Sequence, residues 1–144
     1  MKLSELQQHW QADCKIDELA LDGESLKIPN LHSKYLAWGN EETLNSKKYK
    51  SEYKQLYKTK WEYYSGKLSD EELEEQGWEQ FHLKVLRQDI GLYLDSDKDL
   101  ILLQSKLDYT KQKVDYIEQI MKHLGGRGYL IKNAIDFMRF HTGA

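Results

Sequence analysis

The sequence predicts an all-α fold of long helices, and three observations support this prediction. Apolar residues recur at separations of three and four through the C-terminal third, which is the spacing of one helix face. Charged residues make up 31% and hydrophobic residues 40% of the 144 residues, a balance that suits long helices with extensive solvent-exposed faces. Two serines, Ser69 and Ser96, each stand three residues before an acid, the spacing of a helix start. A chain of this length fits one domain, with or without a protruding arm.

The N-terminal region is expected to be a leader that ends at Pro29, the only proline, because proline disfavours helix at the preceding residue. A short apolar stretch follows, in which Leu31, Tyr35 and Trp38 have helical spacing. Gly39 should end it. The chain up to residue 39 therefore predicts only short elements.

A longer helix is expected from about Glu41 to Tyr64. Asn40 is a good N-cap, and the acids after it suit the positive end of the helix dipole. Ser65-Gly66 should end the helix, because glycine accepts the left-handed conformation that closes many helices. Ser69, with Glu72, predicts another helical turn that Gly77 weakens. Residues 78–94 combine strand-like alternation with helical spacing and receive no assignment.

The C-terminal third has the a and d rhythm of a coiled coil, interrupted once by a threonine. Ser96 to Asp99 should start this helix and Gly125-Gly126 should stop it, which gives a length of about 40 Å at about 1.5 Å per residue. The positions in rhythm are Leu100, Leu103, Leu107, Thr110, Val114, Ile117, Met121 and Leu124.

A last short helix, roughly from Tyr129 to Phe140, is apolar over more than one face and needs a partner surface. Packing within one monomer is the plainer interpretation of the heptad helix, but this last helix favours oligomerisation. We therefore expect residues 1–95 to form an N-terminal region and residues 96–144 a helical oligomerisation region. The expected oligomerisation residues are Leu100, Leu103, Leu107, Val114, Ile117, Met121, Leu124, Ile131 and Ile135.

Charge is strongly segregated along the chain although the net charge is only −3. Residues 1–46 carry a net −4, residues 47–67 a net +5, residues 68–100 a net −7 and residues 101–144 a net +3. A basic island thus lies between acidic flanks, and a local field of this kind steers a polyanion more than the overall sum does.

Within the basic island, aromatic and lysine side chains form two adjacent helical stripes. Tyr49, Tyr53, Tyr57 and Trp61 recur at every fourth residue, and lysines recur one position later. Unstacked bases bind aromatic platforms and phosphates bind cations, so this pattern predicts a site for single-stranded nucleic acid in the helix at about residues 41–67. The alternative is that the aromatic stripe is core packing with a solvated lysine edge. The predicted contacts are Lys47, Lys50, Lys54, Lys58, Lys60, Lys67, Tyr57 and Trp61.

Other functional classes find little support in the sequence. The five histidines lack metal-site spacing, and no nucleophile motif, nucleotide-binding lysine or pair of catalytic carboxylates occurs, so we expect no enzyme activity, cofactor or metal. The single Cys14 cannot form an internal disulfide. The longest aliphatic run, Leu100 to Leu103, is too short to cross a membrane, and the start lacks an apolar signal core. A cytosolic protein is expected.

Three stretches resemble the UvsY recombination mediators of T-even-type phages. They are residues 32–36 (HSKYL), residues 58–67 (KTKWEYYSGK), and residues 97–99 (DKD) leading to residues 127–132 (RGYLIK). The run Tyr63-Tyr64-Ser65-Gly66 followed by a base is the most specific element. The resemblance extends over nearly the whole chain and is weakest in the N-terminal region and in residues 68–92.

The resemblance implies an all-α, ring-forming homo-oligomer, a hexamer or heptamer, that binds single-stranded DNA in the cytoplasm of an infected bacterium. It also implies two protein partners, a RecA-like recombinase and the phage single-strand-binding protein that the recombinase displaces. The DNA-contacting motif of the family, a lysine with an arginine two residues on, falls on Lys58 and Lys60. Lysine at position 60 keeps the charge but loses the planar, bidentate fork of arginine.

The leading hypothesis is therefore a recombination mediator without enzyme activity. A second hypothesis is a coiled-coil scaffold whose tyrosine stripe is buried and whose lysines bind an acidic protein. The acidic residues from Asp70 to Glu79 are a candidate protein-binding surface, because they repel DNA.

Overall fold

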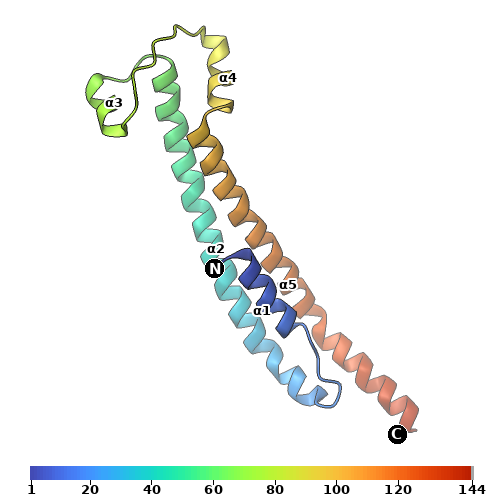
Figure 1. Cartoon of the computed structure of the whole chain (residues 1–144). Coiled ribbons are helices and arrows are strands. Elements are labelled where there is room, and N and C mark those ends of the chain that lie inside the picture. The colour runs from blue at the N-terminus through green and yellow to red at the C-terminus, as the bar shows by residue number, and fades with distance from the viewer. Residues whose placement is uncertain (144) are drawn as a thin grey trace. The chain divides into compact units, whose positions relative to one another are not determined.

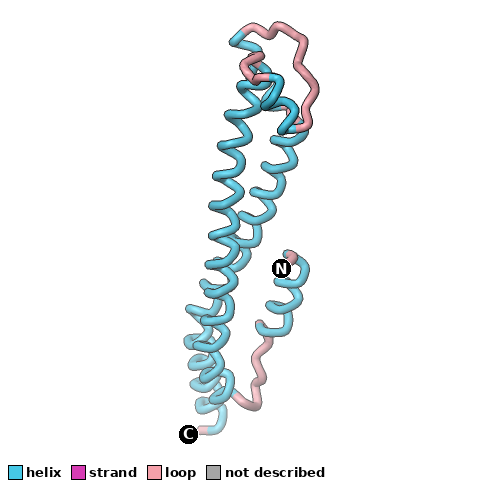
Figure 2. The backbone as a smooth tube through the Cα atoms, turned by 90° about the vertical axis from the view of Figure 1, so that its left-hand side faces the viewer, coloured by secondary structure: helices cyan, strands magenta, loops and turns pink. Residues whose placement is uncertain are grey.

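The computed structural model describes residues 1–143, which are helical apart from connecting segments and contain no strand (Figures 1 and 2). The all-α prediction is confirmed. The elements are α1 (Leu3–Asp13), α2 (Leu21–Tyr64), α3 (Asp70–Gln76), η1, a 3-10 turn (Arg87–Asp89), α4 (Ile90–Asp95) and α5 (Lys98–Thr142).

The chain forms two compact units, and α2 and α5 contribute residues to both. Unit 1 contains Met1–Leu44 and the described residues from Thr110 onward, and unit 2 contains Asn45–Tyr109. Each unit therefore combines residues from both sides of the boundary near residue 95 that the sequence suggested.

The N-terminal region of unit 1 is an integral part of its core. Leu6 on α1 is only 1% exposed and packs with Tyr35 on α2 and Ile117 on α5. Trp10 approaches the Tyr35 ring edge-on, with 5.7 Å between ring centroids. The prediction of a separate leader was wrong because α1 covers apolar surface that α2 and α5 would otherwise expose.

A buried arginine ties the connection between α1 and α2 to α5. Arg127 is 1% exposed, and its guanidinium donates to the backbone carbonyls of Asp13 (2.8 Å) and Lys15 (3.1 Å). It also lies 3.4 Å from a carboxylate oxygen of the buried Glu24. A buried charge that lost these partners would be strongly destabilising, so Arg127 holds this connection in one conformation.

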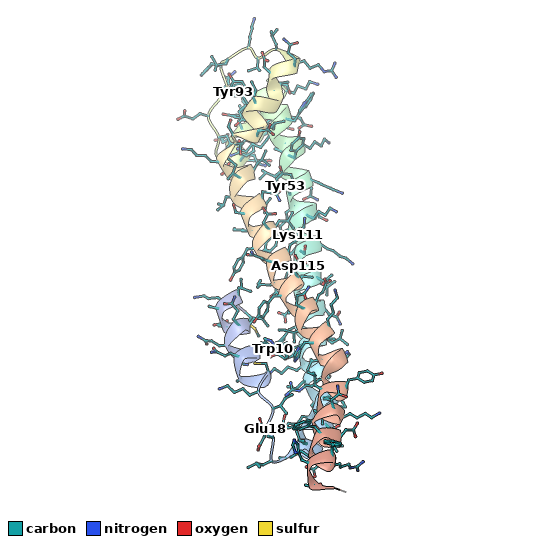
Figure 3. The ribbon with its side chains drawn as sticks, turned by 90° about the vertical axis from the view of Figure 1, so that its right-hand side faces the viewer. Trp10, Glu18, Tyr53, Tyr93, Lys111 and Asp115 are labelled. Atoms are coloured by element: carbon teal, nitrogen blue, oxygen red, sulfur yellow. The ribbon has the colours of Figure 1, made fainter. Side chains whose placement is uncertain are left out.

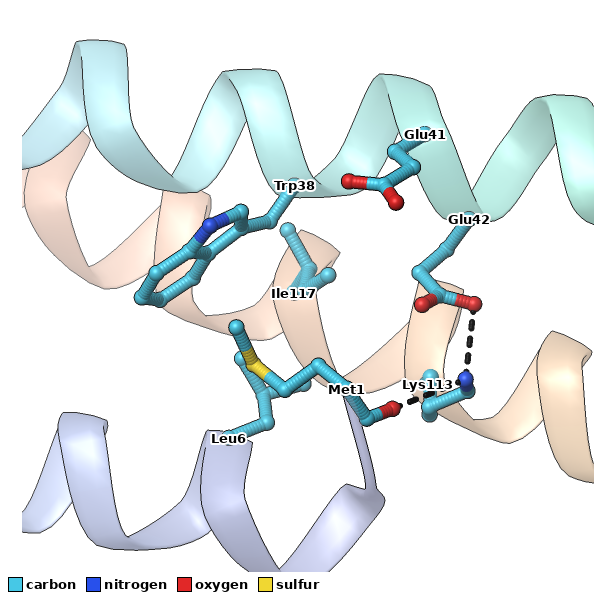
Figure 4. A pocket seen from close by; sticks show the side chains of 7 residues that line it. All are labelled: Met1, Leu6, Trp38, Glu41, Glu42, Lys113 and Ile117. Atoms are coloured by element: carbon cyan, nitrogen blue, oxygen red, sulfur yellow. Dashed lines mark hydrogen bonds and ion pairs between the residues drawn. The ribbon is translucent and has the colours of Figure 1, made fainter.

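A second buried ion pair lies where the start of α1 meets α2 and α5 (Figure 4). The Lys113 ammonium is 2.8 Å from a Glu42 carboxylate oxygen and donates to the Met1 carbonyl at 3.1 Å. The pair lines a cavity of about 220 Å³ whose apolar wall includes Leu6 and Trp38. Polar groups thus fix the position of the first residues of the chain.

Two residues expected to interrupt the N-terminal half lie inside α2. Pro29 and Gly39 are both helical, so the predicted break at Pro29, the stop at Gly39 and the start near Glu41 were wrong. Tertiary contacts decide the outcome, because Glu24 before Pro29 pairs with Arg127, Tyr35 after it packs in the core of unit 1, and tertiary packing supplies most helical stability. A Cβ built on Gly39 would lie 3.1 Å from Ile117 Cγ2, so this glycine allows α2 and α5 to approach closely.

The predicted stop at Gly125-Gly126 was also wrong, because α5 continues to Thr142. The residues that follow the glycines are held by tertiary contacts, since Arg127 and Ile131 are 1% and 3% exposed. The expected heptad helix and the expected last short helix are therefore one element. The rhythm itself follows burial: five of its eight positions are buried and three are half-buried.

Several helix ends in unit 2 agree with the sequence. α2 ends at Tyr64 and Gly66 has a φ of +74°, as expected for a glycine that closes a helix. Ser69 caps α3, accepting from the Glu72 N–H, while the Glu72 carboxylate accepts from the Ser69 N–H. Gly77, with a φ of +71°, ends α3.

The start of α5 differs from the expected one by a single residue. Asp97, rather than Ser96, accepts the hydrogen bond from the Leu100 N–H at 2.9 Å, whereas the Ser96 hydroxyl donates back to the Leu92 carbonyl. The unassigned residues 78–94 comprise a non-helical segment, the turn η1 and most of α4. Ile90, Leu94 and Leu100 form the buried core of unit 2.

Candidate nucleic-acid interface

Four lysines occupy one side of the part of α2 that belongs to unit 2. Lys47, Lys50, Lys54 and Lys58 are separated by three, four and four residues, and all four are exposed. Residues three or four apart are neighbours on a helix surface, so their ammonium groups form a continuous basic face. We call these four residues the lysine face.

Acids compete only weakly for this basic surface. The Lys58 side chain is 81% exposed and its ammonium lies 3.9 Å from Glu62, one turn further along α2. Lys48, beside the lysine face, has a similar contact of 4.0 Å with Glu52. Exposed pairs of this kind contribute about 0–1 kcal/mol, so a phosphate can replace the carboxylate at little cost.

Lys67 adds a cation beyond the end of α2. Its ammonium lies 4.4 Å from the centroid of the Trp61 ring, and the residue is exposed. The contact orients the lysine while leaving its charge in solvent. Lys67 therefore extends the basic surface past the helix.

The aromatic stripe has two environments. Tyr53 and Trp61 are half-buried and pack against the core of unit 2, as the packing alternative expects (Figure 3 labels Tyr53). Tyr57 is 42% exposed and lies beside Tyr53, with 6.2 Å between ring centroids and an interplanar angle of 33°. Tyr57 is thus the member of this stripe best placed to stack on a base.

Lys60 has a different environment from the other lysines of the basic island. It is 5% exposed, and its ammonium lies 2.8 Å from an Asp99 oxygen and 3.1 Å from an Asp97 oxygen. The Trp78 ring lies against it, with its centroid 4.0 Å from the ammonium. The charge of Lys60 is therefore balanced inside unit 2.

Asp97 is the centre of this arrangement. It accepts from the Tyr64 hydroxyl at 2.6 Å, from the Leu100 N–H at 2.9 Å and from Lys60. Burial raises the pKa of Asp97, but these hydrogen bonds and the lysine charge more than offset it and hold the pKa below its ordinary value. Burial and the neighbouring carboxylate raise the pKa of Tyr64. Asp97 is charged and Tyr64 is a neutral donor in the folded unit.

An aromatic cluster that sequence reasoning missed surrounds this site. Six ring pairs, with centroids 5.0–5.6 Å apart, join Tyr63, Tyr64, Trp78, Phe81 and Tyr93. The Tyr63 hydroxyl donates to the Glu79 carbonyl at 2.7 Å, which secures the non-helical segment against α2. The density of aromatics in residues 61–64 was visible in the sequence, but their partners lie in the segment that had no assignment.

Comparison with known proteins decides the family. The family described as "Recombination, repair and ssDNA binding protein UvsY" matches residues 9–144. The chain belongs to the UvsY family. Recombination protein uvsY of Enterobacteria phage T4 is 25% identical over 143 residues, which cover 99% of each chain.

The structure of the chain also matches that of known UvsY proteins. Two crystal structures of the bacteriophage T4 recombination mediator protein UvsY, in different lattices, superpose with TM-scores of 0.86 and 0.85 at 24% identity. The first covers 99% of this chain and 98% of the other, and the second covers 97% and 99%. The chain therefore shares the fold of these structures over almost its whole length.

The residues expected to join UvsY-family subunits are largely buried within the single chain. Leu100, Leu107, Ile117, Leu124 and Ile131 are buried, and the other four, Leu103, Val114, Met121 and Ile135, are half-buried. Eight large apolar side chains of α5 are exposed. Ile101, Leu102 and Tyr109 lie in its first third, and the other five, Tyr129, Leu130, Phe137, Met138 and Phe140, lie toward its C-terminal end.

Residues 1–143 contain no group of three or more histidine, cysteine, aspartate or glutamate side chains that could hold a metal ion. Among these residues, no helix is both long enough and apolar enough to span a membrane.

Proposed function

We propose that this UvsY-family chain is a recombination mediator that binds single-stranded DNA through the lysine face, with Lys67 and Tyr57 beside it. The observation that supports this assignment is the set of exposed ammonium groups on one side of α2, next to a half-exposed tyrosine. Phosphates bind to the cations and a base stacks on the ring, without readout of sequence.

Salt dependence of binding tests the lysine face directly. Each lost phosphate contact to a single strand lowers the slope of log K against log salt by about 0.7. Lys58→Ala should therefore flatten the slope by about that amount, and Lys50, Lys54 and Lys58 changed together to alanine by about 2. Lys111→Ala, an exposed lysine on α5, is the matched control. An unchanged slope in the triple variant would overturn the assignment.

The proposal includes a ring-shaped homo-oligomer, a hexamer or heptamer. Support comes from the five exposed apolar side chains between Tyr129 and Phe140, since contiguous exposed apolar surface commonly marks a protein interface. Several lysine faces on one assembly would engage one strand at high effective concentration, so each face alone needs only weak affinity.

In the proposed role, the oligomer presents a DNA strand to a RecA-like recombinase in the cytoplasm of the infected bacterium. The recombinase then replaces the phage single-strand-binding protein, and any ATP turnover belongs to the recombinase. The test is recombinase ATPase activity on single strands coated with that binding protein. Adding this chain should raise the activity, and adding the triple lysine variant should not.

The alternative function is a scaffold whose lysines bind an acidic protein, and the packing of Tyr53 and Trp61 against the core of unit 2 supports it. It predicts negligible binding to a labelled single strand even at low salt. Fluorescence anisotropy at two salt concentrations separates the two functions.

A further inference from the structure

We infer that Lys60 is a positioning residue, which holds the end of α2 against the start of α5, and is not a phosphate contact. This inference bears on the DNA surface of the proposed function and assigns different roles to two lysines that stand two residues apart. Successive residues are about 100° apart around a helix, so Lys58 and Lys60 point to nearly opposite sides of α2. Lys58 points to solvent and Lys60 into unit 2.

The first argument is the arrangement of partners around the ammonium. A lysine ammonium has three donor protons, and two carboxylates, Asp97 and Asp99, lie at hydrogen-bonding distance. The Trp78 ring covers a further side at 4.0 Å. A phosphate could reach this group only after Trp78 and Asp99 had moved and after a buried ion pair had been broken, which is strongly unfavourable.

The second argument is that Asp97, a partner of Lys60, itself contacts both helices. Asp97 caps α5 through the Leu100 N–H and accepts from Tyr64 near the end of α2. Lys60 supplies the opposite charge that makes a 5% exposed carboxylate tolerable at this junction. The three side chains therefore fix the position of the end of α2 relative to the start of α5. That part of α2 carries Lys58 and Trp61, and the Lys67 ammonium rests on the Trp61 ring.

A matched pair of variants tests the inference. Lys58→Met and Lys60→Met remove the same charge from positions two residues apart. Lys58→Met should flatten the salt slope by about 0.7 and leave the melting temperature nearly unchanged. Lys60→Met should lower the melting temperature by roughly 10 °C at equal protein concentration, with the salt slope unchanged at a temperature where the variant is folded. Lys60→Arg should keep the melting temperature close to that of the unaltered protein, because the arginine fork can bind both carboxylates and stack on Trp78.

A second experiment does not depend on the stability of a lysine variant. Asp99 is the more exposed acidic partner, with its side chain 56% exposed, so Asp99→Asn removes one restraint on Lys60. If Lys60 were held in reserve for DNA, this variant would gain a phosphate contact and a steeper salt slope. The positioning role predicts the same slope as Asp95→Asn, which removes an exposed acid at the end of α4.

The outcomes separate this inference from the proposed function. A flatter slope in Lys60→Met, or a steeper slope in Asp99→Asn than in Asp95→Asn, overturns the positioning role while supporting DNA binding. An unchanged slope in Lys58→Met overturns the DNA surface instead. Loss of stability in Lys60→Met without any change in slope supports the inference.

Discussion

The environment of each residue, rather than its type, decides the role of the lysines between positions 47 and 67. The sequence shows seven lysines in this segment, and their helical spacing correctly separates a basic face from an aromatic stripe. It does not reveal that Lys60 is buried, because that depends on Asp97 and Asp99, which lie almost forty residues away. Long-range pairing of this kind has no local signal.

At the residue scale, the buried Asp97 and the half-buried Asp13 make the free energy of unfolding depend on pH. Asp97 has a lowered folded-state pKa, and so does Asp13, where burial raises the pKa but hydrogen bonds from Lys34 and Tyr35 more than offset it. The unfolded chain binds protons more readily, so this stability is fully present above about pH 4 and is lost as pH falls through the lowered values.

Urea unfolding at a series of pH values between 2 and 6 measures this effect. The free energy of unfolding should fall as the pH drops below about 4, and Asp97→Asn should show a smaller fall because it lacks one of the linked protons. Asp13→Asn should reduce the fall in the same direction, and the double variant should have the flattest profile. Profiles that coincide with that of the unaltered protein would contradict the assignment.

At the scale of elements, helix ends were predictable where the capping chemistry is local. The end of α2 at Tyr64 and the cap of α3 at Ser69 follow from residues within a few positions. Helix ends predicted at Pro29, Gly39 and Gly125 were wrong. A helical glycine costs about 1 kcal/mol and a proline about 3 kcal/mol, and the packing of the residues around them contributes more free energy than that.

The glycines inside the long helices provide a matched test of that explanation. Gly125→Ala should stabilise the protein by about 0.5–1 kcal/mol, because the helix gains a better former and the added Cβ meets nothing within 4 Å. Gly39→Ala should lose part or all of this gain, because its Cβ would lie 3.1 Å from Ile117 Cγ2. Chemical denaturation at fixed protein concentration measures both. Equal gains would show that Gly39 is not needed for close approach of the helices.

At the scale of the whole molecule, two units share two long helices, and the heptad positions of α5 are buried or half-buried within the single chain. The sequence predicted which positions of α5 are apolar, but it could not tell packing within one chain from packing between chains, because the same spacing satisfies both. In unit 1 the apolar positions of α5 pack against α1 and α2. The sequence analysis did not predict this packing, because it treated the N-terminal region as a separate leader.

Assembly should depend instead on the exposed apolar end of α5. Phe137 is 63% exposed, and Phe137→Glu should convert an oligomer to smaller species, because a charge would be buried without a partner at the interface. Light scattering measures the change. Affinity for a long single strand should fall by about 10² or more as multivalency is lost. Lys122→Glu, which places the same side chain at an exposed position of α5, should leave assembly intact.

The burial of Lys60 also has a consequence for covalent chemistry. An acylating reagent reaches an amine only where solvent does, so the six exposed lysines of residues 47–67 should react quickly and Lys60 slowly. Peptide mass spectrometry after brief exposure to such a reagent would therefore report, in the absence of DNA, whether the junction between α2 and α5 is intact. The same modification would neutralise the cations of the lysine face, so acetylation should weaken this surface. Lys60, which positions the end of α2, should remain unmodified.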